Sequence, residues 1–244
     1  MTAITRTRWH QYALDKAGPF PGCTAICSMQ DSTGGSDGLI TWGVNGALDT
    51  YAEVLRASQD WDAARAAAAK WPSRARDLGS DVHVAVDQYN RGLPLEITGD
   101  TAPYVAQYAA WLRNNSIEVL GSEKYVINTT VGFGGTYDSL CRIDGELALV
   151  DVKTGSQKAS QRLQLAGLSM AELHGEPGEE PEPMPKIEVA YILLLRPDGT
   201  ELIRHDITDA DREHFRYLVD TYHAVRKWAK AFTPTAVRTE DIAA

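Results

Sequence analysis

Two strand-like segments joined by a tight turn occupy residues 135–155, GTYDSLCRIDGELALVDVKTG. Asp144 and Gly145 separate the segments. An Asp-Gly pair favours a two-residue hairpin turn, because both central residues of that turn need positive φ. The turn sets the pairing register, in which Ile143 lies opposite Glu146. We therefore predict an antiparallel hairpin at the centre of the fold.

Two carboxylates meet at the far end of this hairpin. In the predicted register Asp138 lies opposite Asp151, with Cβ atoms about 4.5–5.5 Å apart, unless a β-bulge shifts the pairing by one residue. Like charges repel there, and a divalent cation with oxygen ligands would relieve the repulsion. Lys153 lies two residues beyond Asp151 and shares its strand face. The arrangement predicts a Mg²⁺ or Mn²⁺ site for phosphodiester hydrolysis, in which metal-bound water attacks and Lys153 orients it or stabilises charge on the phosphate.

The remaining pattern predicts an α/β fold with a mixed central β-sheet flanked by helices. The chain reads as irregular to about residue 38 and helical to about residue 90. Further expected elements are a helix after Pro103, three consecutive strands over 118–153, a helix over 159–173, two strands about a Pro-Asp-Gly turn, and a helix opened by a capping box at Thr208 and Asp211. We expect one domain, with residues 1–100 as an N-terminal irregular and helical region and 101–244 as the core.

Composition and charge limit the partners. A net charge of −9 and a pI near 5.1 argue against a protein that coats nucleic acid by bulk electrostatics, so any such contact must be local. The stretch EPGEEPEPMP, residues 176–185, predicts an exposed connecting loop. No apolar run approaches the roughly 20 residues of a membrane span and no secretory signal is visible, which predicts a cytoplasmic protein. Cys23, Cys27 and Cys141 are expected to be free thiols.

These residues resemble the PD-(D/E)xK nuclease superfamily, in particular its RecB-like branch with the lambda-type exonucleases. The matching pieces are GTYD with Asp138, LVDVKTG with Asp151 and Lys153, the helix with Gln164, and LGSDVH with His83. Glu123 in GSEKYV matches an acidic residue that often precedes the first core strand. The resemblance implies a restriction-endonuclease-like core, with metal ligands from Glu123, Asp138, Asp151, the Val152 carbonyl and His83, and with Gln164 positioning substrate or Lys153.

The resemblance also implies a biological setting. It suggests a DNA exonuclease for recombination or repair that is phage-encoded and has a single-strand annealing or recombination protein as a partner; oligomeric state is left open. Two features depart from the branch. Leu168 stands where a tyrosine often follows the glutamine, and the cysteine set of the iron–sulfur members is missing, so no cluster is expected.

Several assignments have competitors. Glu118 competes with Glu123 as the metal ligand, Gln161 competes with Gln164 because it lies on a neighbouring helix face, and His83 could be a partly buried structural histidine. Residues flanking the site are the candidate phosphate contacts, although each alone could be a solvated surface charge: Arg74, Arg76, Lys158 and Arg162. The helical tryptophans are expected in the core: Trp42, Trp61, Trp71, Trp111 and Trp228.

Two other functions fit parts of the sequence. A non-catalytic nucleic-acid-binding or assembly protein could retain the nuclease fold, and it would bind DNA without divalent metal or cleavage. An unrelated α/β enzyme could carry the Asp-x-Lys pattern by accident, and then Asp138 and Asp151 would lie far apart.

Overall fold

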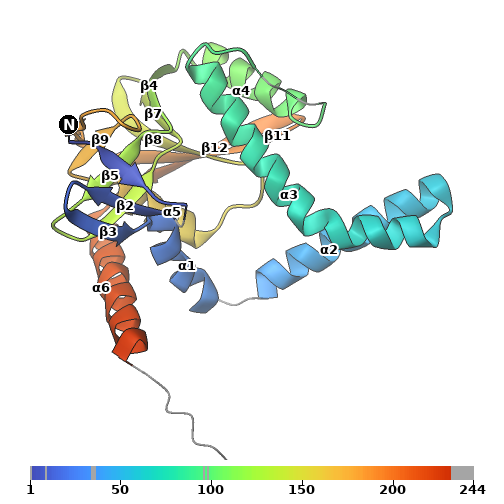
Figure 1. Ribbon diagram of the computed structural model, residues 1–244. Coiled ribbons are helices and arrows are strands. Elements are labelled where there is room, and N and C mark those ends of the chain that lie inside the picture. The colour runs from blue at the N-terminus through green and yellow to red at the C-terminus, as the bar shows by residue number, and fades with distance from the viewer. Residues whose placement is uncertain (1, 9, 34–36, 96, 98, 232–244) are drawn as a thin grey trace, which may run out of the picture.

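A five-stranded mixed sheet forms the centre of the protein in the computed structural model, which describes residues 2–8, 10–33, 37–95, 97 and 99–231. The strand order is β12-β11-β8-β7-β4, and only β8 and β11 pair in parallel (Figure 1). The strands are β4 (Glu118–Ser122), β7 (Ser139–Ile143), β8 (Glu146–Lys153), β11 (Val189–Arg196) and β12 (Gly199–Asp206). The α/β fold with a mixed central sheet is therefore as predicted.

Helices cover both faces of this sheet, because the strands alternate two apolar sets. On β8, Ala148, Val150 and Val152 face a core shared with α3 (Trp61–Asn90) and α4 (Ala102–Asn114). Leu149 faces the opposite core. The helices of that second core are α1 (Cys23–Thr33), α5 (Ala159–Ser169) and α6 (Asp209–Ala231).

A second sheet corrects the prediction of three consecutive strands over 118–153. It has the order β10-β9-β5-β6, with β5 (Tyr125–Asn128), β6 (Phe133–Thr136), β9 (Leu173–Gly175) and β10 (Glu182–Pro183). The first two predicted strands are each broken, at Glu123 and near Asp138, so that each contributes to both sheets. Glu123 has a φ of 50°, which no extended strand can continue through.

The N-terminal segment is not irregular, which corrects a second prediction. A small antiparallel sheet comprises β1 (Ile4–Arg6), β2 (Gln11–Leu14) and β3 (Ala17–Pro21). These strands are too short for an alternating pattern to stand out in the sequence. Packing against the second sheet stabilises these strands. Tyr12 is buried against Gly134 of β6, and a Cβ atom at Gly134 would lie 2.3 Å from the Tyr12 Cβ.

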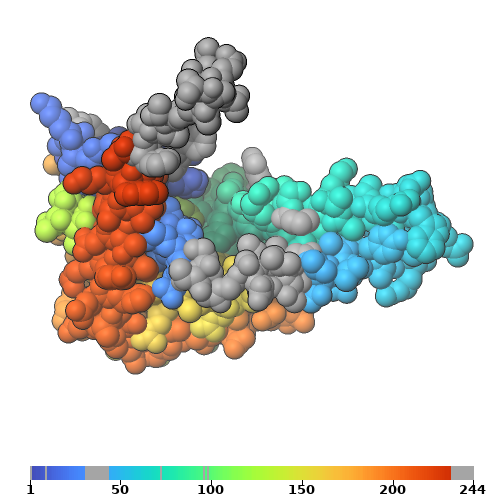
Figure 2. Space-filling model, turned by 90° about the horizontal axis from the view of Figure 1, so that it is seen from below, coloured from blue at the N-terminus to red at the C-terminus, as the bar shows by residue number. Residues whose placement is uncertain are grey.

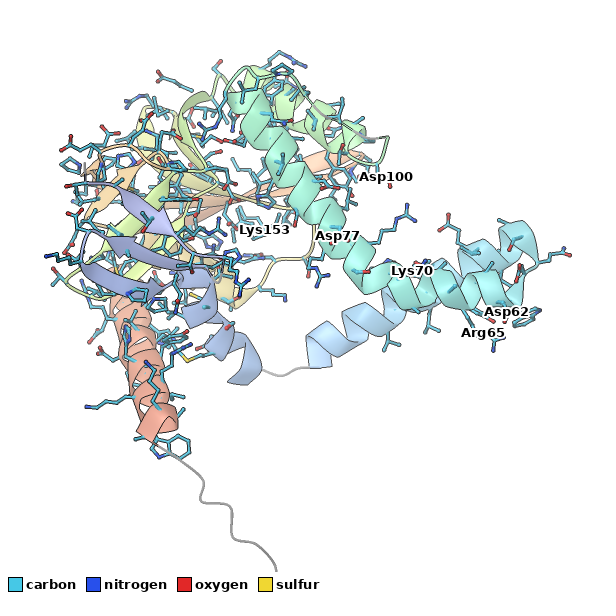
Figure 3. The ribbon with its side chains drawn as sticks, viewed as in Figure 1. Asp62, Arg65, Lys70, Asp77, Asp100 and Lys153 are labelled. Carbon is cyan, nitrogen blue, oxygen red and sulfur yellow. The ribbon has the colours of Figure 1, made fainter. Side chains whose placement is uncertain are left out.

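A helical arm projects from the body of the protein. It consists of α2 (Asp37–Ser58) and the first half of α3, and both Figures 1 and 2 show it extending away from the sheets. Close packing holds the two helices together, since a Cβ atom at Gly46 would lie 2.1 Å from Trp71. Figure 3 shows Asp62 and Arg65 near the outer end of the arm. The helical character of this region is as predicted.

Other local predictions can be checked directly. Thr208 and Asp211 form the expected capping box at α6, and the three cysteines are buried and form no disulfide among the described residues. Trp111 is buried, but Trp61 and Trp228 are 61% and 68% exposed, so their assignment to the core was wrong. The side chain of Trp42 lies outside the described residues. No helix among the described residues has the length and apolar character needed to cross a membrane.

The α5–α6 contact gives a prediction about stability. A Cβ atom at Gly167 would lie 2.5 Å from the ring of Phe215, so Gly167→Val should overpack this core. We expect a loss of about 1–3 kcal/mol in the free energy of unfolding, measured by urea denaturation. Gly199→Val is the control, because no atom lies within 4 Å of a Cβ atom there. Equal stability of the two variants would contradict this packing.

Candidate metal centre

The site forms where two strands pass from one sheet to the other. The β4 strand pairs with β7 in the central sheet, and β5 pairs with β6 in the second sheet. At the two breaks the backbone N–H of Glu123 donates to the carbonyl of Asp138 over 3.1 Å. The two acidic residues are therefore brought together by the interruption of both strands at the same level.

His83 completes a cluster with these two acids. Its Nδ1 lies 3.4 Å from Oδ2 of Asp138 and 3.9 Å from Oε1 of Glu123. One potential ligand atom from each residue lies within 4.8 Å of the others. Gly79, one helical turn before His83, allows α3 to approach the end of β8: a Cβ atom at Gly79 would lie 3.3 Å from Oγ1 of Thr154. Two carboxylates and an imidazole at these distances could hold a divalent cation.

The hairpin register agrees with the prediction up to its last pair. Ile143 lies opposite Glu146, and the pairing continues to Ser139 opposite Val150. Asp138 lies just beyond β7, and its Oδ2 accepts a hydrogen bond of 2.7 Å from the N–H of Val152. The Asp138 carboxylate therefore lies beside β8 at the level of Asp151 and Val152, one step past the last paired residues.

Asp151 forms an ion pair with Lys153. The Lys153 ammonium donates to Oδ1 of Asp151 over 2.6 Å, and the Asp151 side chain is only 4% exposed. Its second oxygen, Oδ2, is buried without a hydrogen-bond partner among the described residues. An orphaned buried carboxylate oxygen costs about 1–3 kcal/mol or more, so this atom needs a cation or a donor that the described residues do not supply. Asp151 is not part of the 4.8 Å cluster.

Burial and crowding of negative charge shift the pKa values of this group. Burial, together with the charges of Asp138 and Asp87, raises the pKa of Glu123 to about 8. Burial also raises the pKa of Asp151, against the opposing effect of Lys153. Burial alone would lower the pKa of Lys153, but the Asp151 and Asp138 carboxylates outweigh it and raise that pKa. Burial and mutual repulsion thus disfavour the ionised forms of Glu123 and Asp151, and a bound cation would stabilise these carboxylates.

A polar network holds the two strand breaks in place. Asn90 donates to the hydroxyls of Ser122 and Ser139, and it accepts a hydrogen bond from the buried Tyr108 hydroxyl. These serines are the direct neighbours of Glu123 and Asp138 in the sequence. The C-terminal end of α3 therefore positions both acidic residues through the backbone segments that carry them.

A cleft of about 640 Å³ opens beside the cluster. His83 and Glu123 line it, with Tyr125 and Pro177 among the other lining residues. Three arginines contribute to its walls: Arg6, Arg76 and Arg91. The cleft gives an extended ligand access to the cluster and places guanidinium groups beside that ligand.

The structure separates several of the competing assignments. Glu118 is exposed and pairs with Arg142, whereas Glu123 lies in the cluster. Gln161 caps its own helix by accepting a hydrogen bond from the N–H of Lys158. Gln164 is half-buried on α5, and its side chain makes no hydrogen bond to a described residue.

The four predicted phosphate contacts fall into different surroundings. Arg162 forms two hydrogen bonds of 2.9 Å with Asp211 and thereby joins α5 to α6. Arg74 pairs with Asp100 at the surface. Arg76 lines the cleft, and Lys158 is exposed at the start of α5. Of these four residues, only Arg76 lies at the described cleft.

Sequence reasoning missed Asp87 and Arg91. Gly79, His83, Asp87 and Arg91 recur every four residues along α3, so they lie along one face of the helix. Arg91 donates to Asp87 over 2.7 Å and to the carbonyl of Ser122 over 2.6 Å. The four-residue spacing was visible in the sequence and could have identified both residues. Arg6 was missed because the N-terminal strands were not recognised.

The chain is similar to known proteins in structure and not in sequence family. No protein-family model matches the chain, and no curated protein matches its sequence. Among solved structures, the chain is similar to LHK-Exo, an alkaline exonuclease from Laribacter hongkongensis: 16% identity, TM-score 0.37, covering 63% of this chain and 86% of that one. LHK-Exo in complex with dAMP gives 17% identity, a TM-score of 0.36 and the same coverage.

The structure of SSO0001 is also similar, at 15% identity with a TM-score of 0.31, covering 50% of this chain and 57% of that one. Likeness at this level assigns neither family nor activity. The interpretation of the site therefore rests on its own geometry.

The raised pKa of Glu123 gives a prediction about stability and pH. Between its ordinary value of 4.5 and about 8, the folded protein keeps a proton that the unfolded chain has released. Raising the pH through this window should therefore lower the free energy of unfolding of the metal-free protein. Urea denaturation in EDTA at several pH values measures the slope. Glu123→Gln should reduce the slope of the free energy of unfolding against pH, and the control Glu118→Gln should not. An unchanged slope in Glu123→Gln would show that Glu123 does not hold this proton.

Asp138→Asn tests the ligand set. Asparagine can still accept the hydrogen bond from Val152, so the fold should survive the loss of the carboxylate charge. We expect Mn²⁺ affinity, measured by calorimetry, to fall by at least about ten-fold. Glu118→Gln removes an exposed carboxylate and should leave the affinity unchanged. Unchanged affinity in Asp138→Asn would remove Asp138 from the ligand set.

Proposed function

We propose that the protein is a divalent-metal-dependent nuclease that hydrolyses DNA phosphodiester bonds. The observation that carries the proposal is the cluster of His83, Glu123 and Asp138, of which His83 and Glu123 line the cleft. The Asp151–Lys153 ion pair lies beside it, because Asp138 accepts a hydrogen bond from the N–H of Val152 between them. Carboxylates that hold a metal beside a lysine suit phosphodiester hydrolysis, because the reaction needs an activated water and neutralisation of charge on the phosphate.

The donor set fits a hard divalent cation such as Mg²⁺ or Mn²⁺. Glu123, Asp138 and His83 would hold the ion, and the orphaned Oδ2 of Asp151 offers a further oxygen. The N–H and C=O of one strand residue point to the same neighbouring strand, so the Val152 carbonyl faces the side on which Asp138 lies. This supports the Val152 carbonyl as a further ligand. When bound, the metal would lower the pKa of a water molecule and offset charge on the phosphate.

Lys153 has an electrostatic role in this proposal. Its raised pKa keeps it as an ammonium group at neutral pH, so it does not serve as a general base. Asp151 orients the ammonium group by accepting its hydrogen bond, and 24% of the Lys153 side chain remains exposed. From this position Lys153 can donate to a phosphate oxygen and stabilise the negative charge that develops there. Figure 3 shows Lys153 in the body of the protein, beside the inner half of α3.

The further assignments of the proposal are a positioning role for Gln164, phosphate contact by Arg76, and exonuclease action in recombination or repair. The half-buried Gln164 stands on α5, in the helix that follows β8 and Lys153. Arg76 supports the second assignment because it lines the cleft. Comparing linear with closed circular DNA tests the third, because an exonuclease needs a free end.

Lys153→Ala tests the catalytic assignment. Linear single-stranded and duplex DNA would be incubated with the protein in Mg²⁺ or Mn²⁺. We expect wild-type cleavage, and a decrease of about 10²–10³-fold in rate for Lys153→Ala because one donor to the phosphate is lost. The variant should still bind Mn²⁺ in calorimetry, since Lys153 is not a ligand.

Lys230→Ala is the matched control, because it removes an exposed lysine near the end of α6. Thermal denaturation checks that each variant is folded. Equal cleavage by wild type and Lys153→Ala would remove Lys153 from the mechanism. DNA binding without cleavage in any divalent metal would favour the non-catalytic binding protein over the nuclease.

A further inference from the structure

The acidic, proline-rich stretch predicted as a loop is a hairpin at the border of the cleft. We use the name acidic hairpin for residues 173–183, which comprise β9, β10 and the turn between them. Pro177 in this turn lines the cleft. Its neighbour Glu176 accepts a hydrogen bond of 3.0 Å from Arg91, which lines the cleft too. The hairpin therefore forms part of the border of the cleft.

Both strands of the acidic hairpin are anchored. Glu182 on β10 lies 3.4 Å from Nε2 of His174 and 3.5 Å from the Lys124 ammonium. His174 is buried, and its Nδ1 forms a hydrogen bond of 3.0 Å with the hydroxyl of the buried Tyr137. The strands lie close together, since a Cβ atom at Gly175 would lie 3.0 Å from the backbone of Pro181. The acidic hairpin is therefore held in a defined position beside the cleft.

The turn carries negative charge that the described residues do not neutralise. Glu179 and Glu180 are exposed, and neither forms an ion pair with a described residue. At physiological ionic strength their repulsion reaches about 8 Å, so it acts on a phosphate backbone passing beside the hairpin. The repulsion does not reach a phosphate backbone that stays at the opposite side of the cleft.

The positive charge available in the cleft is small. Arg91 is engaged by Asp87 and Glu176. Arg6 and Arg76 are the other two arginines of the lining. Arg6 contacts the His10 ring and lies over the rings of Tyr12 and Tyr125, but it forms no ion pair with a described acid. Arg76 makes only a long surface contact of 3.7 Å with Asp77. Two phosphate contacts suit one short strand, whereas a duplex presents about twice the charge per unit length and needs more.

We propose that the acidic hairpin makes the cleft selective for single-stranded over double-stranded nucleic acid, by repelling the second phosphate backbone of a duplex. A single strand is flexible and can follow Arg6 and Arg76 while it avoids Glu179 and Glu180. A duplex is stiff, with a persistence length of about 50 nm, and cannot bend away within the cleft. The inference rests on the proposed nuclease function for the position of the substrate.

Glu179→Gln/Glu180→Gln tests this selectivity. Fluorescence anisotropy would measure the affinity for labelled oligothymidylate, alone and annealed to oligodeoxyadenylate, in Ca²⁺ with the DNA checked for integrity on a gel. Wild type should bind the single strand at least about ten-fold more tightly, with a salt dependence of about −1.4 in log K against log salt for two contacts. The variant should bind the duplex about three- to ten-fold more tightly than wild type, with less change for the single strand.

Glu201→Gln/Glu213→Gln is the control, because it removes the same charge from exposed positions on β12 and α6 and should leave the ratio of affinities unchanged. Equal affinities of wild type for both forms, or an unchanged ratio in the hairpin variant, would overturn the inference. Cleavage assays separate this result from the fate of the proposed function. Selective binding without cleavage would refute only the nuclease, and cleavage with an unchanged ratio would refute only the role of the hairpin.

Discussion

The candidate site depends on one backbone hydrogen bond, from the N–H of Glu123 to the carbonyl of Asp138. It joins two chain segments at the level where each passes between the central sheet and the second sheet. Residues at such a junction are free of the regular ladder, so their side chains can converge on one point. If either strand continued unbroken, Glu123 and Asp138 would alternate along a sheet surface and would not share a cluster with His83.

The junction is costly, and the surrounding structure offsets that cost. Glu123 adopts a left-handed φ of 50°, which costs a residue with a side chain about 1–3 kcal/mol. The buried oxygen of Asp151 and the raised pKa of Glu123 add electrostatic cost. The Asn90 network and the Lys153 ion pair hold these groups in place. Strain and unneutralised charge gathered at one point are typical of a functional site, because a purely structural junction would be selected to remove them.

The sequence predicted those parts of the structure that depend on residues close together in the chain. The register of the β7–β8 hairpin and the capping box at Thr208 depend on residues that are neighbours in the chain, and both were predicted. The break at Glu123 was not, because a left-handed residue without glycine leaves no mark in the sequence. The exposure of Trp61 on the projecting arm was missed because a helical apolar pattern does not say whether anything packs against it.

The same limit applies to contacts between distant segments. The sequence predicts Asp138 opposite Asp151 from the hairpin register, and the paired residues of the ladder end one step earlier, at Ser139 and Val150. The register does not predict which partners the two carboxylates take. Asp138 directly precedes β7 in the chain, and its carboxylate accepts a hydrogen bond from the N–H of Val152. Asp151 accepts a hydrogen bond from Lys153 on its own strand. A side chain at the end of a ladder can bond either to the neighbouring strand or to a residue of its own strand. Which partner it takes depends on the residue at which the strand ends, and tertiary packing determines that residue.

Arg91 links the metal centre to the border of the cleft. Its guanidinium group donates to the carbonyl of Ser122, next to Glu123, and to the carboxylate of Glu176 in the acidic hairpin. Asp87 accepts a third bond, so Arg91 is neutralised by acids of the protein itself and acts as a structural link. In a chain of net charge −9, this arrangement leaves few cations for a phosphate backbone. Recognition must therefore come from where the few free guanidinium groups and exposed carboxylates stand around the cleft, and not from the field of the whole protein.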